Sequence, residues 1–343
     1  MSTIAAGILL IVITAYAIFG GADFGAGFWD LVAGGSDRGR KPRTVIDESI
    51  GPVWEANHVW LVFALVVLWT GFPEAFSSIF LTLFVPFTLA AFGVVLRGSS
   101  FAFRHGVTNL KERRAFGAIF AASSVLVPFC LGAAAGAIAS GRVPTDGVAG
   151  DPWSSWLNPT SILGGVLAVC VVAYLSAVYL VYDARRLSDG DMVEYFRKRA
   201  LAASIVAGGV AFVGIFVLRA DAPYLFDGLT SRALPMVAIS AVAGITSLAL
   251  LIGHAHRGAR MAAICAVGAV IFGWGIAQWD YILPETLTIA DAAAPSGTIG
   301  ALIVVTVFAA IFVFPAIALL FVLDQRGALP DDVYADSAPD GQQ

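Results

Sequence analysis

The segment GPVWEANHVWLVFALVVLWTG, residues 51–71, joins a polar beginning to a long apolar run. The apolar run predicts a helix buried in a membrane, because a spanning helix needs about 20 mostly apolar residues. Residues three and four positions apart share a face of such a helix, so Glu55 lies beside His58 and Trp54 lies one turn below it. A carboxylate, the amide of Asn57 and an imidazole at the start of a membrane helix call for a functional explanation.

The composition is that of a polytopic membrane protein. Of the 343 residues, 59% are hydrophobic and only 13% are charged, and the mean hydropathy is +0.85. A soluble domain has about a quarter of its residues charged. The chain has no basic, aromatic-interleaved stretch that would indicate nucleic-acid binding. Its three cysteines fall in apolar runs without CxxC spacing, so we expect them to be buried thiols.

Nine apolar segments are long enough to cross the hydrocarbon core as helices. They lie near residues 3–32, 53–71, 76–97, 116–139, 160–183, 200–218, 234–253, 260–279 and 298–323. We therefore expect an all-α fold of nine transmembrane helices in a single integral-membrane domain, 1–323, arranged as two four-helix bundles plus one extra helix. The polar remainder, 324–343, predicts a disordered cytoplasmic tail.

The basic residues predict how the helices are oriented. Only Arg142, Arg219 and Arg232 of the 20 Lys and Arg residues fall in the even-numbered connections, which leaves 17 on the opposite side. Connections rich in Lys and Arg remain in the cytoplasm. The N-terminus is therefore expected outside the cell and the C-terminus in the cytoplasm.

Ionisable side chains within the spans are few, and such residues are costly and usually functional. Asp23, in GGADFGAGFW at 20–29, and Glu55 lie toward the same side on consecutive helices. Together they suggest a wet path for protons from the cytoplasm. Two structural alternatives stay open: Glu55 interacts with the helix dipole in the first turn, or Asp23 bonds another helix where Gly21 and Gly25 let backbones approach.

His58 and Arg97 complete the set of candidates. His58 is the only histidine expected inside the bundle, so a bis-histidine haem lacks its second ligand and a metal site lacks further partners. It is better explained as a member of the Glu55 network. Arg97 is expected to end the third span on the cytoplasmic side, where it either snorkels to the interface or pairs with an anionic group. The residues alone leave a transporter, a channel and an accessory subunit of a complex open.

Four segments carry a resemblance to a known family. They are GGADFGAGFWDL at 20–31, IGPVWEANHVWL at 50–61, FPEAF at 72–76 and VLRGSSFAFRH at 95–105. Their order and spacing resemble subunit II, the smaller and haem-free subunit, of cytochrome bd-type quinol oxidases. The match in motifs covers roughly the first third of the chain, and the remainder is similar in its layout of spans.

The resemblance implies a role in a bacterial plasma-membrane complex that passes electrons from a membrane quinol, menaquinol or ubiquinol, to oxygen. Haem b, haem d and the quinol site would belong to the larger subunit I, so this chain would bind no cofactor and would catalyse nothing alone. Further companions compatible with the family are small single-span subunits, membrane lipid and a structural quinone. The competing expectation is a stand-alone proton-coupled secondary transporter.

The resemblance also assigns residues. The expected proton path consists of Asp23, Glu55, Asn57 and His58. Arg97 and Trp54 are expected to support the partner subunit and its haem assembly. No metal ligand is expected in this chain.

Overall fold

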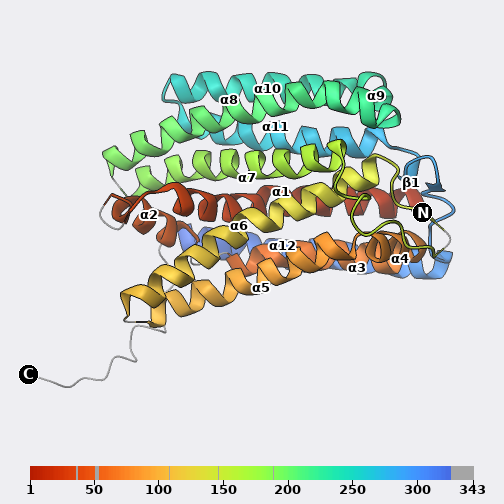
Figure 1. The fold of residues 1–343 in the computed structure, drawn as a ribbon, viewed down its shortest axis with the longest axis horizontal. Coiled ribbons are helices and arrows are strands. Elements are labelled where there is room, and N and C mark those ends of the chain that lie inside the picture. The colour runs from red at the N-terminus through yellow and green to blue at the C-terminus, as the bar shows by residue number, and fades with distance from the viewer. Residues whose placement is uncertain (36–37, 51–53, 108, 146, 188, 326–343) are drawn as a thin grey trace, which may run out of the picture.

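The structure is a computed structural model, and it describes residues 1–35, 38–50, 54–107, 109–145, 147–187 and 189–325. Some side chains within helices, including those of Trp54 and Glu55, lie outside the described part. The long helices run side by side along the long axis (Figure 1). Their bounds are α1 Ser2–Val32, α2 Arg40–Ile50, α3 Trp54–Gly71, α4 Pro73–Thr82, α5 Phe84–Gly106, α6 Leu110–Ala139, α7 Pro159–Arg186, α8 Gly190–Asp221, α9 Pro223–Thr230, α10 Leu234–Ile252, α11 His256–Ala277 and α12 Ser296–Gln325.

The prediction of an all-helical membrane protein is confirmed. In the described part of the chain, eight helices are long and apolar enough to cross a membrane, and the number reaches nine if the bent pair α3–α4 counts as one span. The exception to helix is a short antiparallel pair, β1 (Tyr281–Leu283) and β2 (Leu287–Thr288), between α11 and α12. The predicted tail, 324–343, lies almost entirely outside the described residues.

The predicted placement of the third span, 76–97, is wrong. The chain bends by 118° between α3 and α4, α4 ends at Thr82, and a separate helix α5 runs from Phe84 to Gly106. Pro73 is the first residue of α4. Because proline has no backbone N–H, it cannot continue the hydrogen-bond ladder of α3. Arg97 consequently lies inside α5 and does not end it.

The same break occurs a second time. Phe72 before α4 and Ala222 before α9 have identical backbone angles, φ −139° and ψ 63°, and each precedes a proline. In both places a long helix is followed by a short one and then by another long helix. The sequence shows no repeat, yet α3–α4–α5 and α8–α9–α10 repeat one local structure.

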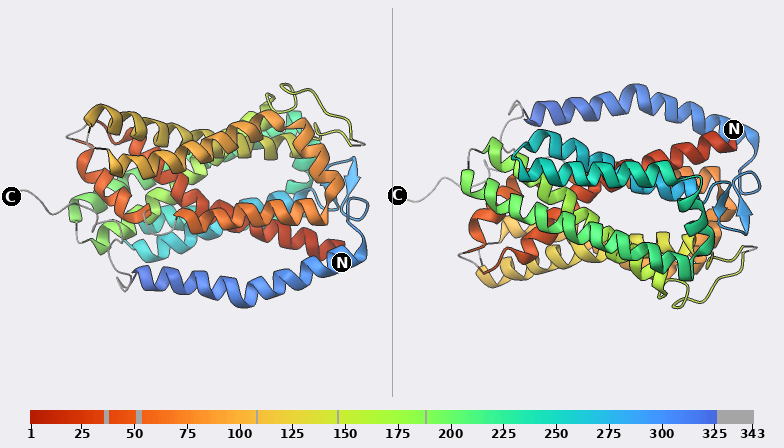
Figure 2. Two further views of the ribbon diagram at one scale, coloured as in Figure 1. Left: turned by 90° about the horizontal axis from the view of Figure 1, so that it is seen from below. Right: turned by 90° about the horizontal axis from the view of Figure 1, so that it is seen from above.

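Helix α1 lies at the centre of the packing, in contact with α3, α6 and α7. The Trp29 indole donates a hydrogen bond to the Ala173 carbonyl at 2.8 Å. At Gly25 a Cβ atom would lie 1.9 Å from the Val172 carbonyl oxygen, so only glycine allows α1 and α7 to approach this closely. Figure 2 shows α12 along one side of the molecule, apart from this centre.

Two other expectations differ from the structure. The first connection contains a helix, α2, that the span pattern does not predict, and its Val45 and Ile46 are buried in the core beside α7. Of the three cysteines, Cys130 is buried, Cys170 is half-buried and Cys265 is exposed. The expectation of burial is therefore wrong for Cys265.

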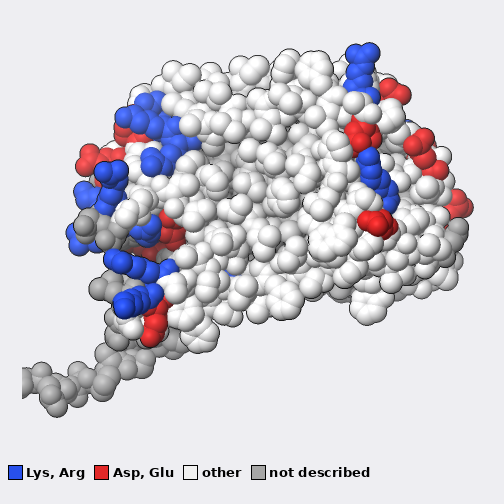
Figure 3. All heavy atoms as spheres, viewed as in Figure 1, with Lys and Arg blue, Asp and Glu red and all other residues white. Residues whose placement is uncertain are grey.

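Charged residues gather at the two ends of the bundle. Figure 3 shows most Lys and Arg at the end where α2 lies, and a broad middle band on this face without charges. Such a band, lined by apolar side chains, is what a lipid bilayer requires of the surface it covers.

Candidate functional site

The centre of the candidate site is a buried ion pair between α1 and α5. Arg97 donates hydrogen bonds to both carboxylate oxygens of Asp23, from Nη2 at 2.8 Å and from Nη1 at 3.2 Å. Nη2 also bonds the Asp23 backbone carbonyl at 3.1 Å. The two side chains are only 2% and 4% exposed. This two-pronged geometry is the strongest form of an arginine–carboxylate contact.

Helix α6 completes the surroundings of the guanidinium. Arg97 Nε donates to the Ser124 hydroxyl at 3.0 Å, and that hydroxyl donates to the Phe120 carbonyl at 2.7 Å. The rings of Phe24 and Phe120 each make a cation–π contact with Arg97, and each ring centroid lies 4.9 Å from the guanidinium carbon. A Cβ at Gly27 would lie 2.1 Å from the Ser124 oxygen, so this glycine makes room for the hydroxyl.

The structure decides between the two explanations of Arg97. An arginine that snorkels extends to the interface and leaves its head in water, whereas the Arg97 side chain is enclosed. The expectation of snorkelling is wrong, and pairing with an anionic group is confirmed, with Asp23 as that group. Among the structural alternatives for Asp23, a bond to another helix is likewise confirmed.

The start of α3 lies next to this pair. Asn57 is buried, and the His58 ring meets the Phe24 ring edge-on at 6.1 Å. Phe24 thus contacts both His58 and the Arg97 guanidinium. The structure therefore brings Asp23, Arg97 and His58 around one aromatic ring, while the side chains of Trp54 and Glu55 lie outside the described residues.

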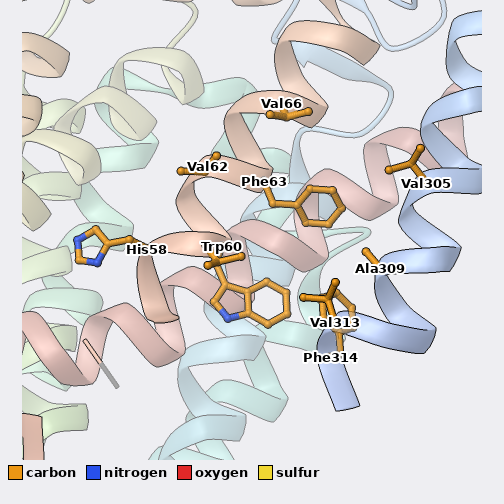
Figure 4. A pocket seen from close by; sticks show the side chains of 10 residues that line it. His58, Trp60, Val62, Phe63, Val66, Val305, Ala309, Val313 and Phe314 are labelled. Atoms are coloured by element: carbon orange, nitrogen blue, oxygen red, sulfur yellow. The ribbon is translucent and has the colours of Figure 1, made fainter. Parts of the chain in front are cut away.

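An apolar groove of about 530 Å³ lies between α3 and α12. Trp60 lies in it, 4.8 Å from the Phe314 ring and 6.0 Å from the ring of Phe19 on α1. Figure 4 shows His58 pointing away from α12, whereas Trp60 and Phe63 point toward it. Helix α3 therefore has an aromatic face toward α12 and a polar residue on its other side.

Two further ion pairs were not anticipated from the sequence. At the basic end, Arg43 of α2 donates to Asp30 at 2.6 Å. At the opposite end, Arg142 bonds both carboxylate oxygens of Asp221, which also accepts from the Thr160 hydroxyl at 2.6 Å. These pairs fasten connections to helix ends and take no part in the buried pair.

Metal ligands do not cluster in the described part of the chain. No three His, Cys, Asp or Glu side chains gather there as a protein-bound metal ion would require. The candidate site is thus built from one acid, one guanidinium, hydroxyls and aromatic rings, a set suited to holding charge and protons.

Comparisons with known proteins address the chain as a whole. The family model described as "Cytochrome bd terminal oxidase subunit II" matches residues 1–323. "Cytochrome bd ubiquinol oxidase subunit 2" of Bacillus subtilis (strain 168) is 28% identical over 213 residues, which is 62% of this chain and 60% of that relative. "Putative cytochrome bd menaquinol oxidase subunit II" of the same organism is 24% identical over 326 residues, covering 91% and 92%.

A solved structure is similar over most of its length. "The structure of bd oxidase from Geobacillus thermodenitrificans" contains a chain with a TM-score of 0.80 and 26% identity, and the match covers 94% of this chain and 98% of that one. The matched part is thus less than two thirds of the first Bacillus relative, but nearly all of the second relative and of the Geobacillus chain.

Proposed function

This chain belongs to the cytochrome bd terminal oxidase subunit II family, and from that membership we propose that it is the haem-free subunit of a quinol:oxygen oxidoreductase. In this proposal a membrane quinol is oxidised, oxygen is reduced to water, and the larger subunit I holds haem b and haem d. The chain catalyses nothing alone. It is a multi-pass protein of the bacterial plasma membrane.

The chain supplies part of a path for proton uptake from the cytoplasm. Oxygen reduction consumes protons inside a low-dielectric core, where uncompensated charge is costly. Glu55, Asn57 and His58 stand in the first two turns of α3, which follows α2 in the chain, and α2 lies at the end rich in Lys and Arg (Figures 1 and 3). The contact of His58 with Phe24 next to Asp23 supports a continuation from α3 to the buried pair.

Asp23 acts in this path as a hydrogen-bond acceptor that Arg97 holds in place through both carboxylate oxygens. The pair is neutral as a whole, so it adds polar atoms to the membrane interior without an uncompensated charge. Beside it, a proton moving through the path meets the oxygens of Asp23 and the hydroxyl of Ser124.

The finer topology belongs to the same proposal. Nine spans, with α3 and α4 as one broken span, give an external N-terminus and a cytoplasmic C-terminus. Helices α1, α3, α5 and α6 form one four-helix bundle, α7, α8, α10 and α11 form the other, and α12 is the extra helix. The repeated break before α4 and α9 supports this pairing of halves.

Subunit I packs against the face formed by α3 and α12. A path that begins at Glu55 must deliver its protons to the partner near α3, and the groove beside Trp60 leaves this face apolar and uncovered. Trp54 begins α3, and its proposed role is likewise support of the partner subunit. Arg97 is enclosed, so it supports the partner and its haems indirectly, by holding α1, α5 and α6 in place.

The experiment is a purification followed by turnover of a single variant. The purified complex should contain a haem-bearing chain, whereas a stand-alone transporter would carry none. Glu55→Gln should lower quinol-driven oxygen consumption by about 10²-fold, the lower end of what a positioned proton-transfer group contributes, and leave the haem spectrum unchanged.

Glu74→Gln is the matched control, because Glu74 is an exposed acid in the first turn of α4, away from the basic end. It should turn over at the parental rate. Parental oxygen consumption in Glu55→Gln, with intact haems, would refute the proton role, and absence of any haem-bearing partner would refute the subunit role.

A further inference from the structure

One polar group next to the buried pair has no partner. The hydroxyl oxygen of Tyr16, on α1, is buried and makes no hydrogen bond to any described residue. Its ring is half-buried among apolar neighbours that include Phe24 and Val127. Buried hydroxyls in proteins almost always have a partner, in the protein or in ordered water.

Tyr16 and Asp23 lie on the same face of α1. The two residues are seven positions apart, two helical turns on one face of α1. Gly20 lies between them, and its ideal Cβ position is 2.9 Å from the Tyr16 ring. Since glycine has no side chain, the Tyr16 ring packs against this turn of α1, which lies between Tyr16 and Asp23.

The electrostatic surroundings agree with this placement. Tyr16 lies within range of the charges of Arg97 and Asp23, and its ring meets Phe24 edge-on at 6.5 Å. Each Asp23 oxygen accepts one side-chain bond from Arg97. A carboxylate oxygen can accept two, so each retains capacity for another donor.

We infer that an ordered water molecule bridges the Tyr16 hydroxyl and the Asp23 carboxylate, which makes Tyr16 a further residue of the proton path. The water donates one hydrogen to the carboxylate and accepts the Tyr16 proton in a second bond. Such a water satisfies the orphaned hydroxyl and is held by more than one polar partner, as buried waters are. This inference rests on the proton path proposed above.

The inferred arrangement adds one water and the Tyr16 hydroxyl to the polar groups around Asp23. A proton arriving at the water is stabilised by the Asp23 carboxylate, and the water then releases one proton to the next acceptor of the path, while Tyr16 keeps its own proton and holds the water in place. The numbers of protons on Tyr16 and on the water are the same before and after. Asp23 keeps both of its bonds to Arg97 throughout.

The test removes only the oxygen atom. In the purified complex, Tyr16→Phe should lower quinol-driven oxygen consumption roughly tenfold, less than the loss of a direct proton-transfer group. The ratio of rates in H₂O and D₂O should rise, which lost packing alone would not produce. The haem spectrum should be unchanged, because phenylalanine retains the ring.

Tyr174→Phe is the matched control. Tyr174 is a buried tyrosine of α7 whose hydroxyl bonds Ser247, and Ser247 keeps its bond to the Ala259 carbonyl without it. This variant should retain the parental rate and isotope ratio. A tenfold loss of rate in Tyr174→Phe as well would overturn the inference, because the loss would then follow from removing any buried tyrosine hydroxyl.

A measurement on the parent complex needs no variant. A high-resolution map should show water density about 3 Å from the Tyr16 hydroxyl oxygen, and its absence would overturn the inference. If Tyr16→Phe has parental kinetics while Glu55→Gln is slow, this inference fails and the proton path stands. If Glu55→Gln is also at the parental rate, the path itself fails.

Discussion

At the scale of single residues, the pairing of Asp23 with Arg97 governs the site. The sequence predicts both residues as candidates, because ionisable side chains inside apolar runs are few. It does not predict that they meet, since they are 74 positions apart and spacing reports only on neighbours along one helix. Ser124 was missed for the same reason, although two adjacent serines in an apolar span were a visible signal.

A double-mutant cycle should measure this pairing. Asp23→Asn and Arg97→Gln should each destabilise the complex by about 3–5 kcal/mol, because each leaves one buried charge without its partner. The double variant should lose clearly less than the sum. The readout is thermal unfolding of the purified complex.

An exposed ion pair of α8 offers the control for that cycle. Lys198 is 71% exposed and its partner Glu194 40%, so Lys198→Gln should cost about 1 kcal/mol or less, as surface pairs do. Strictly additive losses for Asp23→Asn and Arg97→Gln would show that the two side chains do not stabilise one another.

At the scale of helices, the sequence predicts where spans exist better than where they bend. The proline at position 73 indicates the break between the predicted spans 53–71 and 76–97. The apolar run continues from α4 into α5, however, so hydropathy alone merges α4 with the first half of α5. A bend of 118° leaves no trace in hydropathy, because both arms of the bend are apolar. For the contact of α1 with α7, the sequence indicates only that Gly21 and Gly25 permit a close approach of backbones. It does not identify the helix that approaches.

The close approach of α1 and α7 can be tested with one methyl group. Gly25→Ala should destabilise the complex by about 3 kcal/mol, the upper end for overpacked cores, because the new Cβ meets the Val172 carbonyl oxygen. Gly7→Ala on the same helix meets nothing within 4 Å and should be neutral or slightly stabilising. Thermal unfolding and the amount of complex in membranes report both. Equal stability of the two variants would contradict the contact.

At the scale of the whole molecule, the distribution of charge could be predicted from sequence alone, and the arrangement of the halves could not. Counting Lys and Arg by connection needs only the spans, and Figure 3 shows the expected concentration at one end. The repeated break before α4 and α9 is a property of backbone angles. A proline follows the break in both places, but the other side chains differ, so no sequence repeat reveals it.

Labelling of introduced cysteines should establish the orientation. In a background without the three native cysteines, Val148→Cys lies in the α6–α7 connection and should react with a membrane-impermeant maleimide added to whole spheroplasts. Leu187→Cys, in the α7–α8 connection, should react only after the membrane is opened. Both side chains are exposed, so access to the reagent depends on the side of the membrane. The reverse pattern would invert the proposed topology.

The separation of Asp23 and Arg97 along the chain has a consequence for biosynthesis. During translation the first helix leaves the ribosome well before its arginine has been made, since Asp23 and Arg97 are 74 positions apart. Until α5 follows, the acid must either carry a proton or stay sheltered by the insertion machinery, because a bare carboxylate in lipid is costly. The nascent chain therefore completes its core only when the third long hydrophobic helix arrives, and truncated products ending before Arg97 should be recognised and degraded.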